Sequence, residues 1–362
     1  MKSKSVLLVV ISILASTANA EILYNVIDLG GNNSVAYSIN NIGQVVGEAK
    51  TASRLGTTAI LFDITGGGNN IKLGSNLSGN RSNAYSINNH GQAVGEVGDN
   101  AVLFDTTANN NNIILGTLGY PGDNGFNYGH ASAINDNGQI VGHSKYGYYN
   151  YGTTLFDSTG NGNNKYLGGR GGDWFAINNS GQIVGGDYTT TPYHHMQAML
   201  YDITGNNNIL LGTFGGTYSY AYGINDSGQI VGSATYAGTN GSLNGLSHAA
   251  LFDRSGNRNN IDLDPFGTGS TAWSINNNGQ IVGDAGGGYA TLFDITGAGN
   301  NINLNELIDP SLGWVLETAY GINDNGWIVG AGNKGAYLLT PIPEPATLFI
   351  LGLGALFLRK RK

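Results

Sequence analysis

One nine-residue phrase, INDNGQIVG at 134–142, constrains the fold more than any other feature, because it recurs along the chain with small changes. Its seven copies begin at Ile39, Ile87, Ile134, Ile177, Ile224, Ile275 and Ile322. Successive copies are separated by 48, 47, 43, 47, 51 and 47 residues. A period near 47 indicates a repeat architecture and is close to the length of a four-stranded propeller blade.

Each repeat unit contains four strand-like runs, which in the first unit lie near 36–40, 44–48, 59–63 and 70–74. No window shows sustained helical periodicity or helix caps, so the sequence predicts an all-β fold. Apolar pairs such as Ile140-Val141 place apolar side chains on both faces of a strand, which suits sheets stacked on both sides. Within the phrase, Asn40 suits the first position of a type I turn with an Asx-turn, and Gly43 suits a left-handed bulge residue.

The two ends of the repeat region complement each other. Residues 22–31 read as a fourth strand and residues 335–340 as a third strand, so the last unit lacks a fourth strand that the N-terminal segment can supply. This arrangement closes a ring and removes an exposed strand edge. The sequence therefore predicts a seven-bladed β-propeller of four-stranded blades over residues 21–340. An open β-solenoid is the alternative.

The N-terminal segment has the three parts of a secretory signal peptide. Lys2 and Lys4 form a basic region, residues 6–14 are apolar, and 18–20 read Ala-Asn-Ala. We therefore predict a signal peptide over 1–20 that is cleaved after Ala20. Export is compatible with the absence of cysteine, which also excludes a disulfide framework and thiolate chemistry.

The C-terminal residues 341–362 combine Pro343, Glu344 and Pro345 with an apolar stretch at 346–358 and the basic tail RKRK. At about 1.5 Å per residue the stretch forms a short transmembrane segment. The whole segment resembles the PEP-CTERM sorting signal of Gram-negative bacteria. That resemblance implies processing by an exosortase and transient inner-membrane anchoring, followed by delivery to the cell surface or outside the cell. It also implies an association with exopolysaccharide and biofilm matrix.

The repeats themselves resemble the HAF family of extracellular repeats, in which IN..GQ.VG is followed by a His-Ala-apolar-aromatic strand. The His-Ala part is retained clearly once, at His248-Ala249, while equivalent positions hold residues such as Thr58 and Gln197. The resemblance covers residues 21–340 and implies no catalytic activity.

Charge limits the classes of partner. Residues 21–340 carry ten Lys or Arg and twenty-three Asp or Glu, so the body of the protein is strongly acidic and should repel nucleic acid. No motif of a hydrolase, metalloprotease or nucleotide-binding loop is present, and we predict no catalytic residue, no cofactor and no metal. Asp136-Asn137-Gly138 lacks the downstream acid of a calcium loop, and His194-His195 lacks a third zinc ligand.

Loops on one side of the predicted blades are short and repetitive, whereas those on the other side vary, as a binding surface does. The variable loops are rich in tyrosine, and two tryptophans lie just before first strands. We name as candidate ligand-binding residues Tyr120, Tyr128, Tyr146, Tyr148, Tyr149, Tyr151, Trp174, Tyr193, Tyr218, Tyr220 and Trp273. Aromatic faces beside amides suit sugars or a protein surface; the alternative is that these tyrosines merely pack the loops.

These observations predict a non-catalytic exported protein of the cell surface or extracellular matrix. Its variable face would bind exopolysaccharide or a surface protein. One alternative is a polysaccharide-degrading glycoside hydrolase or lyase, with acids drawn from Asp123, Asp173, Asp187 and Asp264. A purely structural matrix protein is the other alternative.

Overall fold

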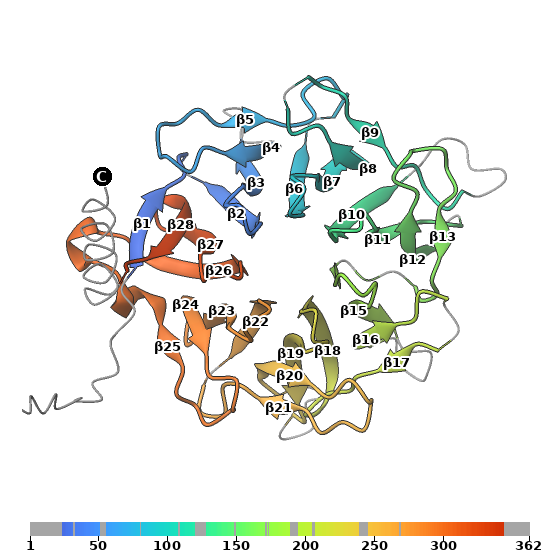
Figure 1. Cartoon of the computed structure of the whole chain (residues 1–362). Coiled ribbons are helices and arrows are strands. Elements are labelled where there is room, and N and C mark those ends of the chain that lie inside the picture. Colours follow the sequence, from blue (N-terminus) through green and yellow to red (C-terminus); the bar gives the residue numbers. More distant parts are fainter. Residues whose placement is uncertain are drawn as a thin grey trace, which may run out of the picture. The chain divides into compact units, whose positions relative to one another are not determined.

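The computed structural model describes residues 24–343, apart from positions 32, 51–55, 80, 108, 120–127, 148–149, 171, 173, 189–194, 205–206, 239–244 and 268. Residues Tyr24–Pro341 form one compact unit, separate from Met1–Leu23 and Ile342–Lys362. Its strands form seven antiparallel sheets of four strands each, arranged around a central axis (Figure 1). The predicted seven-bladed β-propeller is confirmed, and the solenoid alternative is excluded. The predicted signal peptide, its cleavage after Ala20, and Glu344 and Pro345 lie outside the described residues.

The innermost strands of the blades are β2 (Ser34–Ile39), β6 (Ser82–Ile87), β10 (Gly129–Ile134), β14 (Phe175–Ile177), β18 (Gly215–Ile224), β22 (Ser270–Ile275) and β26 (Leu316–Ile322). The second strands are β3 (Val45–Lys50), β7 (Ala93–Val97), β11 (Ile140–Lys145), β15 (Ile183–Tyr188), β19 (Ile230–Tyr236), β23 (Ile281–Ala285) and β27 (Ile328–Gly332). The third strands are β4 (Thr57–Phe62), β8 (Asn100–Phe104), β12 (Tyr151–Phe156), β16 (Met196–Tyr201), β20 (Ser247–Phe252), β24 (Tyr289–Phe293) and β28 (Gly335–Pro341).

The outermost strands are shorter than the sequence suggests. They are β5 (Ile71–Lys72), β9 (Ile113–Ile114), β13 (Lys165–Tyr166), β17 (Ile209–Leu210), β21 (Ile261–Asp262), β25 (Ile302–Asn303) and β1 (Tyr24–Asp28). Except for β1, each pairs through only two residues. The described residues also include two short 3-10 helices, η1 (Leu304–Leu307) and η2 (Pro310–Leu312), which the sequence analysis did not predict. No described helix is long and apolar enough to cross a membrane, and the predicted segment 346–358 is outside the described residues.

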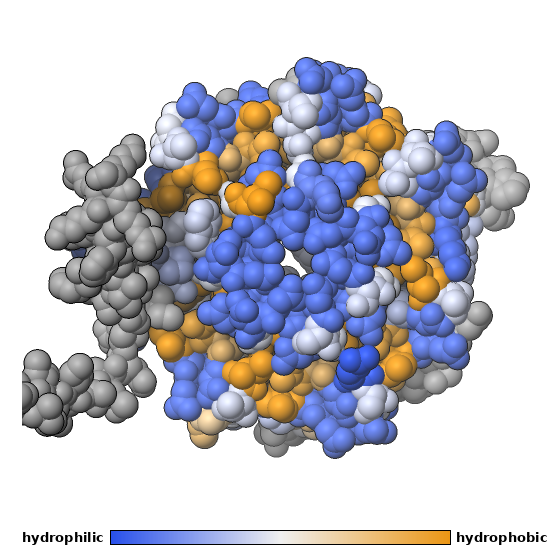
Figure 2. All heavy atoms as spheres, viewed as in Figure 1, coloured by the Kyte–Doolittle hydropathy of each residue, from blue (hydrophilic) through white to orange (hydrophobic). Residues whose placement is uncertain are grey.

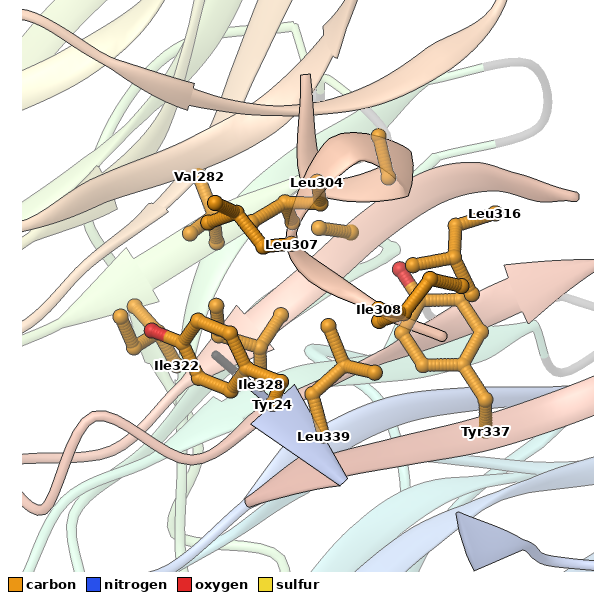
Figure 3. Packing of buried hydrophobic residues seen from close by; sticks show 12 residues of the cluster. Tyr24, Val282, Leu304, Leu307, Ile308, Leu316, Ile322, Ile328, Tyr337 and Leu339 are labelled. Carbon is orange, nitrogen blue, oxygen red and sulfur yellow. The ribbon is translucent and has the colours of Figure 1, made fainter. Parts of the chain in front are cut away.

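The ring closes through the N-terminal strand, as predicted. β1 pairs antiparallel with β28, with Tyr24 opposite Pro341 and Asp28 opposite Tyr337. Tyr24 is 4% exposed and lies in the apolar cluster that also contains Ile328 and Leu339, shown in Figure 3. The closing strand therefore contributes buried apolar surface as well as backbone hydrogen bonds, and it covers the edge that β28 would otherwise expose.

The apolar pairs of the phrase pack between blades. In β11, Ile140 joins the cluster that contains Val94 and Leu115 of the preceding blade. Val141 joins the cluster on the opposite face, with Leu167 and Ile177. Because successive strand residues point to opposite faces, one Ile-Val pair fills the cores on both sides of its blade. Both side chains are fully buried.

The asparagine after each repeated isoleucine links neighbouring blades. Within its own turn, Asn40 accepts a hydrogen bond from Gln44 N at 2.8 Å. Its side-chain amide also donates to the backbone oxygen of Asn88 in the next blade at 2.9 Å. The same bond recurs around the whole ring, from Asn88, Asn135, Asn178, Asn225, Asn276 and Asn323, and the last one donates back to Asn40. Only an amide both donates and accepts in this way, which explains why all seven positions are asparagine.

The next position forms a second ring. Its members are the residues that directly follow the seven asparagines, beginning with Asn41. The backbone N–H of each member donates to the side-chain oxygen of the corresponding residue in the following blade, at 2.7–2.9 Å, and the last donates back to Asn41. Three members, Asp136, Asp226 and Asp324, are aspartates, and the side-chain amides of neighbouring asparagines donate to them. Figure 2 shows hydrophilic residues around the central opening of the blades. The two rings of hydrogen bonds therefore link all seven blades around the mouth of the channel.

Two positions in the phrase require glycine, each for a different steric reason. Gly138 has φ 73°, so it takes the predicted left-handed position of the turn. Gly142 has a different role, because a Cβ there would lie 1.9 Å from the backbone oxygen of His130 on the neighbouring strand. That close approach accompanies a β-bulge in the inner strand, between Ala131 and Ala133.

Candidate functional site: an aromatic funnel on the variable face

In six of the seven blades, the inner strand contains a bulge whose extra residue lines the channel. In β2 the bulge lies between Ala36 and Ser38, which leaves Tyr37 without a cross-strand partner. Bulges are known to redirect side chains, and they occur here at the same place in six blades. The blade containing β14 shows no bulge, and there both Trp174 and Phe175 line the channel.

We call the aromatic residues that line one cavity of the channel the aromatic collar: Tyr37, Tyr85, Trp174, Phe175, Tyr222, Trp273 and Tyr320. Ser132 takes the equivalent position in the third blade. Five of the rings form a closed circuit of contacts, with centroid separations between 5.5 and 6.1 Å. Trp174 contacts both Tyr85 and Trp273, which belong to the second blade before and the second blade after its own. We call the collar, together with the side pocket that shares Tyr37, Tyr85 and Trp174 with it, the aromatic funnel.

In three blades a collar ring is held by the acidic residue that follows the tightly packed glycine of the second strand. Tyr85 donates to Glu96 at 2.9 Å, and the indole N–H of Trp273 donates to Asp284 at 2.6 Å. Tyr37 is hydrogen-bonded to Glu48 in the same way. These partners fix the rings before any ligand arrives, which lowers the entropic cost of binding.

A side pocket of about 580 Å³ opens from the collar over the first three blades. Its volume lies within the range of small-ligand sites. Tyr37, Tyr85 and Trp174 are shared with the collar, and the other residues that line it are Glu48, Lys50, Gly56, Thr57, Arg81, Asn83, Tyr128, His130 and His143. Aromatic faces and charged groups therefore meet in one concave site on the variable side of the ring.

One wall of the side pocket is a buried carboxylate network. Oε1 of Glu96 accepts hydrogen bonds from Arg81 at 2.7 Å, Asn83 at 2.9 Å and Tyr85 at 2.9 Å. The Glu96 side chain is 3% exposed, whereas that of Arg81 is 61% exposed. The network therefore neutralises the carboxylate and presents the guanidinium to solvent.

A stack of rings adjoins this network. His130 and His143 lie parallel with centroids 5.0 Å apart, and Tyr128 stacks on His143 at 5.5 Å. His130 Nδ1 lies 3.1 Å from Ser132 Oγ. Burial, reinforced by the nearby charge of Arg81, lowers the pKa of His130 to about 4. This imidazole is therefore neutral at physiological pH.

The tyrosine hydroxyls of the pocket are poor proton acceptors. Burial, and then the charge of a neighbouring glutamate, raises the pKa of both Tyr37 and Tyr85 far above its usual range. Burial also raises the pKa of Glu48. Hydroxyls that keep their protons act as hydrogen-bond donors, which suits recognition better than proton abstraction.

The structure brings together part of the set that the sequence suggested. Tyr128 and Trp174 line the side pocket, and Trp273 belongs to the collar, within β22 rather than before it. Tyr151 packs edge-on against Tyr128, and Tyr220 stacks on Tyr222 of the collar. Tyr146 and Tyr218 instead pack against Tyr166 and His195 and line neither cavity. Outside the described residues lie Tyr120, Tyr148, Tyr149 and Tyr193.

Of the acids considered for an enzyme, the two that the structure describes, Asp187 and Asp264, do not line the funnel. Asp187 accepts a hydrogen bond from Arg170 N at 2.8 Å, and burial raises its pKa. Asp264 accepts a bond from Asn301, and Asp123 and Asp173 are outside the described residues. The described residues contain no group of three or more His, Asp or Glu suited to a metal. His248, of the single His-Ala dipeptide, is buried, with Nδ1 2.9 Å from Asp262.

Sequence reasoning missed the collar residues Tyr37, Tyr85, Tyr222 and Tyr320, together with Glu48, Arg81, Glu96, His130 and His143. A signal for the collar was present, because an aromatic residue stands two positions before most of the repeated isoleucines. A search for positions that vary between repeats does not detect this aromatic residue, because it recurs in most repeats. No local pattern marks the charged wall, whose members come from separate strands.

Comparisons with known proteins agree with the fold and the C-terminal signal. The PEP-CTERM protein-sorting motif matches residues 341–362. No curated protein matches the chain. A solved structure described as YCF48 bound to D1 peptide is 12% identical, with a TM-score of 0.50, and the match covers 89% of this chain and 96% of that one. A putative gluconolactonase is 9% identical, with a TM-score of 0.40, and coverage is 90% and 96%.

At this identity the YCF48 likeness supports the propeller fold alone. The sorting motif adds that the protein is exported, is anchored transiently in the membrane and is processed by an exosortase. Together they give an exported surface protein built on a β-propeller scaffold.

Proposed function

We propose that this protein is a non-catalytic binding protein of the cell surface or extracellular matrix, and that its aromatic funnel binds exopolysaccharide. The observation that supports this most is the collar, in which aromatic rings from different blades form one concave surface. Such rings present apolar faces to sugar C–H groups while their polar edges are already satisfied. The neighbouring amides and hydroxyls supply the hydrogen bonds that a sugar needs.

Binding is favoured over cleavage by the state of the pocket groups. A lyase would need a group ready to accept a proton, yet the hydroxyls of Tyr37 and Tyr85 are held protonated by burial and neighbouring carboxylates. A hydrolase would need two carboxylates free to act on the glycosidic bond, and Glu96 is committed to three donors. A binding role requires neither condition.

The test is binding of the full-length chain, purified in detergent, to a panel of immobilised polysaccharides. Replacing Trp174, which is 40% exposed, by Ala should weaken binding at least about tenfold, equivalent to about 1.4 kcal/mol. Tyr289→Ala is the matched control, because Tyr289 is similarly exposed at the start of β24 but lies outside the funnel. Equal loss in both variants would contradict a site in the funnel.

The same material separates the alternatives. Release of new sugar chain ends that is abolished by Glu48→Gln would instead establish an enzyme. Binding of a surface protein, but of no polysaccharide, would assign the funnel to a protein partner. Binding of neither would leave a structural role in the matrix.

A further inference from the structure

We infer that the side pocket selects polysaccharides whose sugars carry a carboxylate, and that Arg81 is the residue that recognises this group. The inference depends on the proposed function, since it assumes that the funnel binds a polysaccharide. It adds a substrate class, because nothing in the collar itself distinguishes acidic from neutral sugars.

Arg81 is positioned as a recognition group rather than as a simple surface charge. Within the described part of the chain, its hydrogen bonds to Glu96 at 2.7 Å and Tyr85 at 3.5 Å are both made by Nη2. Arg81 lines the pocket, and its side chain is 61% exposed. A guanidinium fixed at one edge presents the planar fork that binds a carboxylate through two parallel hydrogen bonds.

The carboxylate that anchors Arg81 does not repel an acidic ligand strongly. Glu96 is almost fully buried, and one of its oxygens accepts three hydrogen bonds. The other acid of the pocket, Glu48, is half-buried and hydrogen-bonded to Tyr37. Toward the solvent, the charged groups that remain most exposed are therefore Arg81 and the exposed Lys50.

This placement is notable because cations are scarce in the protein. Residues 21–340 hold ten Lys or Arg against twenty-three Asp or Glu, and two of the ten line a single pocket. An acidic polymer would be repelled by most of this surface. At physiological salt that repulsion is screened beyond about 8 Å, so a local pair of cations can still hold an acidic sugar.

The pocket also provides stacking surfaces beside the cation. Tyr85 lies next to Arg81, and the centroids of the Tyr85 and Trp174 rings are 6.1 Å apart. A sugar ring resting on these faces would place a substituent carboxylate near the guanidinium. The same sugar without a carboxylate would keep the stacking but lose the charge-assisted hydrogen bonds.

The experiment measures binding of the full-length chain in detergent to three probes: a polyuronate, a neutral glucan and a sulfated glucan. We expect the polyuronate to bind at least about tenfold more tightly than the neutral glucan. Arg81→Lys keeps the charge but loses the fork, and should remove most of that preference. Arg81→Met with Glu96→Gln removes the ion pair together, so that no buried carboxylate is left without its partner. Lys334→Met, on the same face but outside the pocket, is the control for charge alone.

The outcomes separate this inference from the function on which it depends. If binding is sensitive to Trp174→Ala but does not prefer the polyuronate, or is unchanged in the Arg81 variants, the carboxylate selection is wrong and the funnel site stands. Equal or tighter binding of the sulfated glucan would also overturn the carboxylate assignment. If no probe binds, the proposed function and this inference both fail. Full preference for the polyuronate in Lys334→Met, with its loss in both Arg81 variants, supports the inference.

Discussion

The side-chain amide of Asn323 donates to the backbone oxygen of Asn40 at 3.0 Å, and so joins the last blade to the first across 283 residues. This bond completes a ring in which seven asparagines each link two blades. It acts at the inner end of the blades, whereas pairing of β1 with β28 closes the outer end. Hydrogen bonds therefore close the ring at both the inner and the outer side of the last blade.

We expect that losing one link of the asparagine ring will destabilise the fold. Asn135→Ala removes the amide that donates to the backbone oxygen of Asn178 and accepts from Gln139 N, and should lower the free energy of unfolding by about 1–3 kcal/mol. Asn135→Asp keeps the acceptor but removes the donor, and should cost at least as much. Urea denaturation measures both. Asn161→Asp, in an exposed turn, should change little; equal effects at both positions would contradict the ring.

Gly142, which follows the Ile140-Val141 pair, is expected to tolerate no side chain. In Gly142→Ala the new Cβ would meet the His130 oxygen at 1.9 Å, and the free energy of unfolding should fall by about 3 kcal/mol or more. Gly223→Ala is a matched control, because its nearest contact would be 3.1 Å and equivalent positions hold Ser38 and Ala133. Thermal melts of the two variants should differ clearly. Similar melting temperatures would show that the bulge can shift.

His130 predicts a specific pH dependence of stability. Its pKa is about 4 in the folded protein and near 6.5 in the unfolded chain. Between these values the unfolded chain binds more protons, so stability is complete above pH 6.5 and is lost as the pH falls toward 4. The loss attributable to this group should approach about 3 kcal/mol. His130→Gln should flatten that part of the profile, measured by urea midpoints, whereas exposed His90→Gln should leave it unchanged.

Ring closure predicts a rescue experiment. Deleting residues 22–29 removes the buried side chains Tyr24 and Leu29 and exposes the edge of β28, so the protein should aggregate or melt at a lower temperature. A synthetic peptide spanning 22–31 should restore the melting temperature when added in excess, because it can pair with the vacated edge. A monomeric deletion variant with an unchanged melt would show that β1 is dispensable.

The sequence was sufficient for the parts of the fold that each unit encodes locally. Turn residues such as Gly138 and the Ile140-Val141 pair determine turns and packing within one unit or against its neighbour, and their repetition revealed the number of blades. The closing strand could be predicted because the last unit was incomplete. The lengths of the outer strands could not be predicted. Only two residues of each outer strand pair with the third strand, and no local sequence signal marks where that pairing ends.

The site was predicted less completely, for two physical reasons. Tyr37 and its counterparts repeat, so they resemble scaffold residues until the bulge shows that they face the channel. Arg81, Glu96 and His130 lie on three different strands, or just before them, and their spacing has no sequence signature. Variation among loops pointed to the face of the ring on which the side pocket lies, but it did not identify most of the residues that form the pocket.

The second ring of the channel mouth also limits how the number of blades can change. Its members alternate between asparagine and aspartate except at one seam, where Asn41 bonds to Asn89, because an odd number of positions cannot alternate throughout. Duplicating the unit that carries Asp136 would set two carboxylates side by side with no amide between them. Duplicating the unit that carries Asn89 would only lengthen the neutral seam. The charge pattern of this ring therefore makes duplication of an asparagine-bearing unit less destabilising than duplication of an aspartate-bearing unit.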